Sequence, residues 1–199
     1  MVINFTKKFQ FSTRISLDNT LLEEVTECRL LGLTITNQLS WHQNTENIVK
    51  KANTRMIILH KLFEFNLPAE EMVNIYILFI RSMLEYSCVV WHSSITEEEN
   101  ISIERVQKTA LRIILNEHYS DYTSALELSG LETLCERRTQ LSLNFAKKCL
   151  KDDRNADLFP LNVKTVNTRP HETYYVTPAR TDRLARSTVP YIQRLLNVQ

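Results

Sequence analysis

The stretch Met72–Trp91, MVNIYILFIRSMLEYSCVVW, is the most apolar part of this 199-residue chain, and the fold is predicted outward from it. It contains neither glycine nor proline, and Asn74, Arg81 and Glu85 are its main polar interruptions. A membrane-spanning helix needs about 20 mostly apolar residues, and these interruptions argue against one. A helix that is apolar nearly all round is buried. We therefore expect residues 69–92 to form the central core helix of a bundle.

Helices are also predicted on both sides of this stretch. After Trp41, apolar residues recur at spacings of three and four, which is the stripe of an amphipathic helix. The stripe consists of Ile48, Ala52, Met56, Leu59 and Phe63. Thr96 begins a capping box, Thr-Glu-Glu-Glu, and predicts a helix to about Leu115. Further helices are expected over 121–129, with Gly130 as the C-terminal stop, and over 131–150.

The first 37 residues have the pattern of strands. Thr13–Leu17 alternates polar and apolar residues, which is the period of a half-buried strand. Asp18 and Asn19 follow with the chemistry of a turn. Cys28–Thr36 is rich in β-branched and apolar residues around Gly32, and a glycine inside a strand often marks a bulge or a close backbone approach.

The C-terminal part has no helical stripe of comparable length. Residues 152–199 contain scattered prolines and arginines, so we expect an extended, partly disordered tail with a short amphipathic helix at 190–197.

The patterns together predict an α+β chain that is mostly α. A small N-terminal antiparallel β-hairpin or sheet over 1–40 precedes a helical bundle over 41–151 and the irregular tail.

Composition excludes several classes of protein. With only two glycines, Gly32 and Gly130, the chain can build neither the three-glycine dinucleotide fingerprint nor a phosphate-binding P-loop. The formal net charge of +1 does not by itself demand nucleic acid or membrane as a partner. The four cysteines are far apart, which predicts reduced thiols and no structural zinc. No apolar signal segment is recognisable, so we expect an intracellular protein, cytoplasmic or nuclear, that is not secreted.

No group of residues has the spacing of a catalytic or metal centre. The chain contains neither a His-x-Asp iron motif nor a His-Glu-x-x-His motif. Ser120 lies near His118 and Asp121, but these residues share a polar connector after a helix and are expected to cap and turn it. We expect no catalytic residue, no metal, no cofactor, no small-molecule substrate and no membrane association.

Four cations follow the predicted helix after Trp41: Lys50, Lys51, Arg55 and Lys61. Lysine and arginine on one helix face can neutralise nucleic-acid phosphates without reading base sequence. The same spacing also describes an ordinary solvated helix face. From the spacing alone both interpretations stay open, and the pair Arg137-Arg138 is equally ambiguous.

An ordered series of motifs gives more information than any one of them. In chain order the motifs are Leu30–Ile35 (LLGLTI), Leu39–Trp41 (LSW), Lys50–Ala52 (KKA), Phe79–Tyr86 (FIRSMLEY), Ile103–Ile114 (IERVQKTALRII) and Val189–Asn197 (VPYIQRLLN). This series resembles the C-terminal part of a non-LTR, LINE-type (Jockey/CR1-like) retrotransposon reverse transcriptase, and the resemblance covers nearly the whole chain.

The resemblance implies a role for each region. Residues 1–40 would be the end of the palm, and 41–151 the thumb and the helices after it. Leu30, Leu31, Gly32 and Leu33 would form a primer-grip-like turn. Lys50, Lys51, Arg55 and Lys61 would face the template–primer duplex of RNA or DNA.

The departures from the family pattern limit the expected activity. The family's catalytic Ala-Asp-Asp motif would lie upstream of Met1, with the fingers and the rest of the palm, and nothing in this sequence replaces it. We therefore expect a non-catalytic fragment of a retrotransposon-derived RNA-directed DNA polymerase, from a truncated element copy, that contacts nucleic acid and is no enzyme on its own.

Two alternatives stay open. The fragment could be a functionless structural relic of the truncated element, sharing the same fold. Segments such as 1–95 also resemble a short region found under the name of AlkB-homologue tRNA-modifying enzymes. That name would imply oxygenase or methyltransferase activity, but the chain has no His-x-Asp motif for iron and no glycine-rich loop for S-adenosylmethionine.

Overall fold

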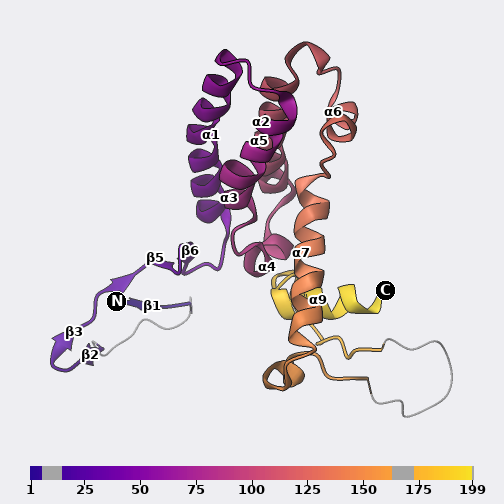
Figure 1. The fold of residues 1–199 in the computed structure, drawn as a ribbon. Helices are drawn as coiled ribbons and strands as arrows, with labels where there is room; N and C mark the ends of the chain where they lie inside the picture. Colours follow the sequence, from indigo (N-terminus) through magenta and orange to yellow (C-terminus); the bar gives the residue numbers. More distant parts are fainter. Residues whose placement is uncertain (6–14, 163–172, 199) are drawn as a thin grey trace.

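The chain is mostly helical, with small two-stranded sheets at its N-terminal end and a helical C-terminal tail, as the sequence predicts. The computed structural model describes residues 1–5, 15–162 and 173–198. Helices α1, α2 and α5 stand close together in Figure 1, with α7 continuing below them. The short strands extend away from the lower end of α1, and helix α9 lies across the lower part of α7.

Helix α1 (His42–Glu64) contributes one wall of the main core. Ala52, Met56 and Leu59 of the predicted stripe are buried there, and Ile48 packs against them half-buried. Phe63 is the exception, because 42% of it is exposed. It lies in the last turn of α1, and Leu62 packs against the core instead. The stripe is therefore confirmed except at its end.

The predicted helix over 69–92 is divided into shorter pieces. Helix α2 (Ala69–Tyr76) continues into a π-helical turn, Ile77–Arg81, and then into α3 (Ser82–Glu85). The chain breaks at Ser87, whose φ of +49° is left-handed, and resumes as α4 (Cys88–Trp91).

One face of this divided segment forms the centre of the core, and the other is exposed. Tyr76, Ile80 and Leu84 are fully buried, whereas Leu78 and Phe79 are exposed. The prediction of one continuous helix, apolar and buried all round, is therefore wrong. A π-helical turn holds one residue more than an α-helical turn and rotates the face that follows it.

The run Ala69–Ser94 is, among the described helical segments, the one long and apolar enough to cross a membrane by length and composition. In its most apolar window 28% is buried inside the protein. A core helix of a soluble protein passes the same test, so the finding alone assigns no location.

The remaining helices of the bundle begin and end close to the predicted positions. They are α5 (Glu97–Leu115), α6 (Tyr122–Ser129) and α7 (Leu134–Cys149). Thr96 and Glu99 form the predicted capping box at the start of α5. Gly130, with φ +66°, ends α6 as predicted, because glycine adopts left-handed φ without steric cost.

The N-terminal residues form three separate strand pairs among the described segments. Strands β1 (Val2–Ile3) and β4 (Glu24–Val25) pair in parallel, whereas the other two pairs are antiparallel as predicted. Strands β2 (Ser16–Leu17) and β3 (Thr20–Leu21) are joined by Asp18-Asn19, which is the predicted turn. Part of the predicted strand Thr13–Leu17 lies outside the described residues.

The segment predicted as one strand around Gly32 folds back on itself. Strands β5 (Glu27–Leu30) and β6 (Leu33–Thr36) form an antiparallel hairpin, and Leu31-Gly32 is its two-residue turn. The glycine therefore reverses the chain and does not mark a bulge within a strand.

The C-terminal tail has more packed structure than the pattern over 152–199 predicts. Helix α8 (Asp182–Ala185) precedes α9 (Thr188–Asn197), which begins two residues before the predicted helix. Ile192 of α9 is buried with Phe159 and with residues of α7 in a second, smaller core. Residues 163–172 of the tail predicted to be partly disordered lie outside the described residues.

Candidate nucleic-acid interface

The primer-grip-like turn is a tight hairpin turn held by the helical bundle. Leu31 and Gly32 have φ values of +47° and +87°, and Leu30 and Leu33 face each other as the last strand pair. Two positive φ values are typical of a two-residue hairpin turn that matches the twist of its strands. The Tyr86 hydroxyl donates a 2.9 Å hydrogen bond to the Leu31 carbonyl oxygen.

The second strand of the hairpin is fixed to the start of α1. The backbone N–H of Thr34 donates to the Asn44 side-chain oxygen at 3.1 Å, and the Asn47 amide donates to the Thr34 hydroxyl at 3.2 Å. Leu33, only 7% exposed, inserts into the main core. These contacts hold the hairpin in a fixed position relative to α1.

The structure divides the four predicted grip residues into two kinds. Leu30 and Leu31 are 55% and 83% exposed at the tip of the hairpin, where a ligand can reach them. Gly32 faces Tyr86, since a Cβ placed on it would lie 3.2 Å from that ring. Leu33 is buried and contributes packing, so it is not available to a ligand.

The four predicted cations are all exposed on α1, but they do not form one stripe. Lys50 and Lys61 are about three helical turns apart and share a line along the helix. Lys51 and Arg55, four residues apart, share a second line that is displaced by about 100°. Neighbouring residues from the two lines, such as Lys50 and Lys51, therefore project from adjoining sides of α1.

Two of these cations already have protein partners. Arg55 donates from Nη1 to the carbonyl oxygen of Phe79 at 2.7 Å, within the π-helical turn. Lys61 pairs with Glu64 at 3.1 Å on the surface. Lys50 and Lys51 form no ion pair within the described part of the chain. Of the four predicted cations, these two, the α1 lysine pair, are the most available for phosphate.

Ion pairing accounts for Arg137 and burial accounts for Arg138, the two arginines whose role the sequence leaves ambiguous. Arg137 pairs with Glu85 at 3.1 Å and with Glu132 at 3.7 Å. Arg138 is completely buried, and its guanidinium lies 5.7 Å from the Trp91 ring. Neither arginine is available to nucleic acid, and both join α7 to the rest of the bundle.

A buried histidine accompanies Arg138. The His92 Nδ1 accepts a 3.2 Å hydrogen bond from the Arg138 Nε, and the His92 Nε2 lies 3.2 Å from the Thr139 hydroxyl. Burial, together with the positive charge of Arg138, lowers the pKa of His92 to about 4. The ring is therefore neutral at pH 7, and sequence reasoning missed this arrangement because its members lie on different helices.

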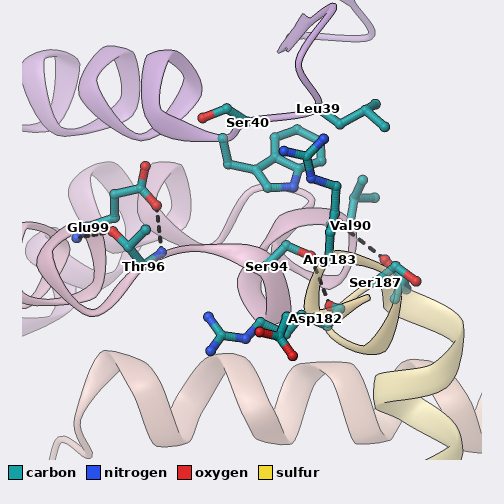
Figure 2. Close-up of a pocket in the computed structure, with 12 residues that line it drawn as sticks. Leu39, Ser40, Val90, Ser94, Thr96, Glu99, Asp182, Arg183 and Ser187 are labelled. Carbon is teal, nitrogen blue, oxygen red and sulfur yellow. Dashed lines mark hydrogen bonds between the residues drawn. The ribbon is translucent and has the colours of Figure 1, made fainter. Parts of the chain in front are cut away.

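A pocket of about 470 Å³ lies where the start of α1, the start of α5 and helices α8 and α9 meet (Figure 2). It is lined by Leu39, Ser40, Trp41, Val90, Ser94, Thr96, Glu99, Asp182, Arg183, Arg186, Ser187 and Thr188. Figure 2 shows Arg183 and Asp182 reaching in from the α8 side and Glu99 beside Thr96 on another wall. The lining contains two arginines, Arg183 and Arg186, and two acidic residues, Asp182 and Glu99, so its formal charges balance.

The hydroxyl groups around this pocket are bonded to backbone and not to a base. Ser94 donates to the Arg186 carbonyl oxygen at 2.8 Å, and Ser187 donates to the Leu184 carbonyl oxygen at 2.7 Å. The Glu99 carboxylate accepts from the Thr96 N–H at 2.7 Å. An activated nucleophile needs a hydroxyl bonded to a base, and these pocket hydroxyls lack that arrangement.

Metal-ligating and thiol chemistry is equally sparse in the described segments. Their residues contain no group of three or more His, Cys, Asp or Glu side chains that could hold a metal ion. All four cysteines are free: Cys88 and Cys149 are buried, whereas Cys28 and Cys135 are half-buried. Burial raises the pKa of the Cys88 thiol to about 11, which makes it a poor nucleophile.

Comparison of the chain with protein-family models, with curated proteins and with solved structures gives no match. Its function is therefore inferred from the residues and from their geometry.

Proposed function

We propose that this chain is a thumb-like, non-catalytic nucleic-acid contact region derived from the reverse transcriptase of a non-LTR retrotransposon. Its ligand would be a template–primer duplex, held through the phosphate backbone. The order of elements supports the proposal, since a strand hairpin with a tight Leu31-Gly32 turn precedes a helical bundle. This is the order that the motif series implies.

The observation that carries the proposal is the α1 lysine pair. Lys50 and Lys51 are exposed on a helix that is fixed to the hairpin, and no acidic side chain pairs with them among the described residues. Binding to phosphate releases counterions, so unpaired lysines contribute affinity without reading base sequence. A rigid helix loses little freedom when its lysines bind.

A matched pair of double variants tests this role. Lys50→Gln/Lys51→Gln removes two charges from α1, and Lys147→Gln/Lys148→Gln removes the same two charges from exposed positions on α7. Affinity for a short RNA–DNA hybrid duplex is measured by fluorescence anisotropy at several salt concentrations. We expect the α1 variant to flatten the dependence of log affinity on log salt by about 1 for each lysine removed, and the α7 variant to leave it unchanged.

Two results would overturn the proposal. One is an absence of duplex binding by the parent chain at low salt, and the other is an equal effect of both double variants.

The genomic sequence just upstream of Met1 tests the family separately. A frame there that encodes Ala-Asp-Asp, intact or slightly disrupted, would support a retrotransposon origin.

The competing proposal is a structural relic with no binding function. Its support is the exposed apolar surface of the short strand pairs, where Leu17, Leu21 and Leu31 face solvent. Unpaired strand edges promote association between chains. A relic should therefore oligomerise in sedimentation experiments and bind no duplex, whereas a monomer that binds duplex would count against it.

A further inference from the structure

The polar residues Glu104 and Gln107 of the IERVQKTALRII motif on α5 have structural roles in the fold. The Tyr76 hydroxyl donates to the Gln107 side-chain oxygen at 2.8 Å, and the Gln107 amide donates to the Tyr122 hydroxyl at 3.0 Å and to the Glu132 carbonyl oxygen at 2.9 Å. The Tyr122 hydroxyl donates to Glu104. Glu104 and Gln107 therefore join α5 to the helices around it.

The same motif also contains cations on the outside of α5. Arg105, Lys108 and Arg112 recur at spacings of three and four, and this set is called the α5 strip. Arg105 and Arg112 are exposed, and Lys108 is half-buried. The strip extends along the helix for about 10 Å. Nothing in the packing of the described residues requires three positive charges there.

Two members of the α5 strip are held in place by tyrosine rings. The Lys108 ammonium lies 4.8 Å from the centre of the Tyr122 ring, and the Arg112 guanidinium lies 5.3 Å from the centre of the Tyr119 ring. A cation over an aromatic ring is attracted to it but keeps its charge. The rings therefore orient the cations without neutralising them.

Among the described residues, the nearby carboxylates of Glu104 and Asp121 have other hydrogen-bond partners and form no ion pair with the strip. Glu104 is bonded by Tyr122 and by the backbone N–H of Leu134 at 3.1 Å. Asp121 caps α6 through the N–H of Thr123 at 2.9 Å. Glu117 is exposed in the turn after α5, and no ion pair joins any acidic side chain of the described residues to the strip.

The α5 strip is a surface separate from the α1 lysine pair. Helices α1 and α5 pack against each other, and Leu59 of α1 and Ile103 of α5 are fully buried in their shared core. Lys50 precedes Leu59 by about two and a half helical turns, and Arg112 follows Ile103 by the same distance. The extra half turn places each cation on the opposite side of its helix from the buried residue. Lys50 and Arg112 therefore each lie on the side of the helix opposite this core.

We propose that Arg105, Lys108 and Arg112 form a second phosphate-binding surface, which contacts the sugar–phosphate backbone of a nucleic acid. The proposal rests on the proposed function and extends it to a part of the chain that the α1 lysine pair does not reach. The tyrosine rings are covered by their own cations, so the strip recognises phosphate and does not stack on bases. Cations held in position lose less freedom on binding than free side chains do.

The test neutralises the strip without removing the α1 lysine pair. The triple variant Arg105→Gln/Lys108→Gln/Arg112→Gln is compared with Lys50→Gln/Lys51→Gln and with the α7 control Lys147→Gln/Lys148→Gln. Each protein is titrated with a short RNA–DNA hybrid duplex and with a short single-stranded RNA over a range of salt concentrations. We expect the triple variant to flatten the salt dependence by about 1 for each phosphate that it no longer binds, for at least one of the two ligands.

Two further variants separate charge from structure. Arg105→Gln/Arg112→Gln keeps Lys108 over Tyr122, and it should flatten the salt dependence by about two thirds of the triple variant's change if each cation contributes about 1. Arg105→Lys/Arg112→Lys keeps the charge, and it should restore the parental dependence. Circular dichroism and thermal melting confirm that each variant is folded.

The outcomes distinguish the second surface from the proposed function. A triple variant that binds both ligands like the parent, while the α1 variant is weakened, overturns the second surface alone. The reverse result supports the second surface and overturns the role of the α1 lysine pair. A parent chain that binds neither ligand overturns both proposals. The ligand that responds to the triple variant shows whether the strip contacts duplex or single strand.

Discussion

The hydroxyl of Tyr86 donates a 2.9 Å hydrogen bond to the carbonyl oxygen of Leu31, a residue 55 positions earlier in the chain. This bond joins the tip of the β5–β6 hairpin to the point where the long apolar segment breaks. The break at Ser87 and the docking of the hairpin are thus adjacent in space. Loss of the bond should release the tip before it affects the bundle.

The first prediction concerns this bond. Tyr86→Phe removes one hydrogen bond and should loosen the hairpin by about 1 kcal/mol, which is roughly a fivefold change in an opening equilibrium. Hydrogen exchange of the amides over 27–36 should therefore become faster, while exchange in α5 stays the same. Tyr175→Phe is the control, because no hydrogen bond of the Tyr175 hydroxyl is present among the described residues. Unchanged exchange at the hairpin would contradict the prediction.

The two glycines provide a second prediction with its own control. Gly130→Ala meets no atom within 4 Å and should cost about 1 kcal/mol of stability from its positive φ alone. Gly32→Ala carries the same backbone cost and also brings a Cβ to 3.2 Å from the Tyr86 ring. Chemical denaturation should therefore show a larger loss at Gly32. The additional loss at Gly32 should vanish when Tyr86→Ala is added, because the ring is then absent. Equal losses for the two glycine variants in the parent chain would refute the predicted contact with Tyr86.

The buried histidine predicts a pH dependence. The pKa of His92 is lowered to about 4 in the folded chain, whereas an unperturbed histidine has a pKa of about 6.5. Between these values the unfolded chain binds more protons than the folded chain, so stability falls as the pH falls through this window. The full difference corresponds to about 3 kcal/mol.

Carboxylates titrate in the same pH range and also change the stability. Comparison with His92→Gln separates the contribution of His92 from theirs. The free energy of unfolding is measured for the parent and for His92→Gln from pH 7 to pH 4. The parent's free energy of unfolding should fall more steeply than that of His92→Gln as the pH is lowered below about 6.5, because the parent gains one more proton on unfolding. Curves that stay parallel over the whole range would show that His92 does not titrate as expected.

A fourth prediction concerns the buried polar network around Gln107. Gln107→Leu leaves the Tyr76 hydroxyl, the Tyr122 hydroxyl and the Glu132 carbonyl without this partner. Tyr122 keeps its bond to Glu104 and Glu132 is exposed, so the Tyr76 hydroxyl is the buried group that loses its partner. A buried polar group left unpaired costs about 1–3 kcal/mol, and the variant should lose that much stability. Thermal denaturation measures the loss. Gln140→Leu, at an exposed position, should be nearly neutral, and a similar melting temperature for both variants would contradict the role of the network.

The last prediction separates two neighbouring cations on α1. Arg55 bonds the Phe79 carbonyl at 2.7 Å, so Arg55→Gln should lower stability by about 1 kcal/mol through the π-helical turn. Lys50→Gln should leave stability unchanged and weaken duplex binding. Denaturation and anisotropy on the same two variants check both effects. A stable Arg55→Gln variant that binds weakly would instead make Arg55 a direct contact.

Several parts of the fold follow from patterns of neighbouring residues. The capping box at Thr96 and the stop at Gly130 are decided by hydrogen bonds and φ values within one or two turns, and both occur as predicted. The division of residues 69–92 was not predicted, because every residue there is compatible with a helix. The break lies between two long-range contacts, the hydrogen bond from Tyr86 to Leu31 and the packing of Trp91 in the core.

The candidate site shows the same limit. The four cations on α1 are recognisable from the spacing alone, but only the fold shows that Arg55 and Lys61 have partners and that Lys50 and Lys51 have none among the described residues. The cation–tyrosine contacts of α5 join residues on different elements. Sequence spacing does not encode such contacts.

Short-range chemistry was thus enough to place most of the helices, to exclude nucleotide-loop folds from two glycines, and to mark the cations. Contacts between distant segments decided which of those cations have protein partners, and they buried Arg138 and His92 together. The physical reason is that capping and φ preference act within a few residues. Burial, charge pairing and the cost of a missing hydrogen bond depend on which segments meet.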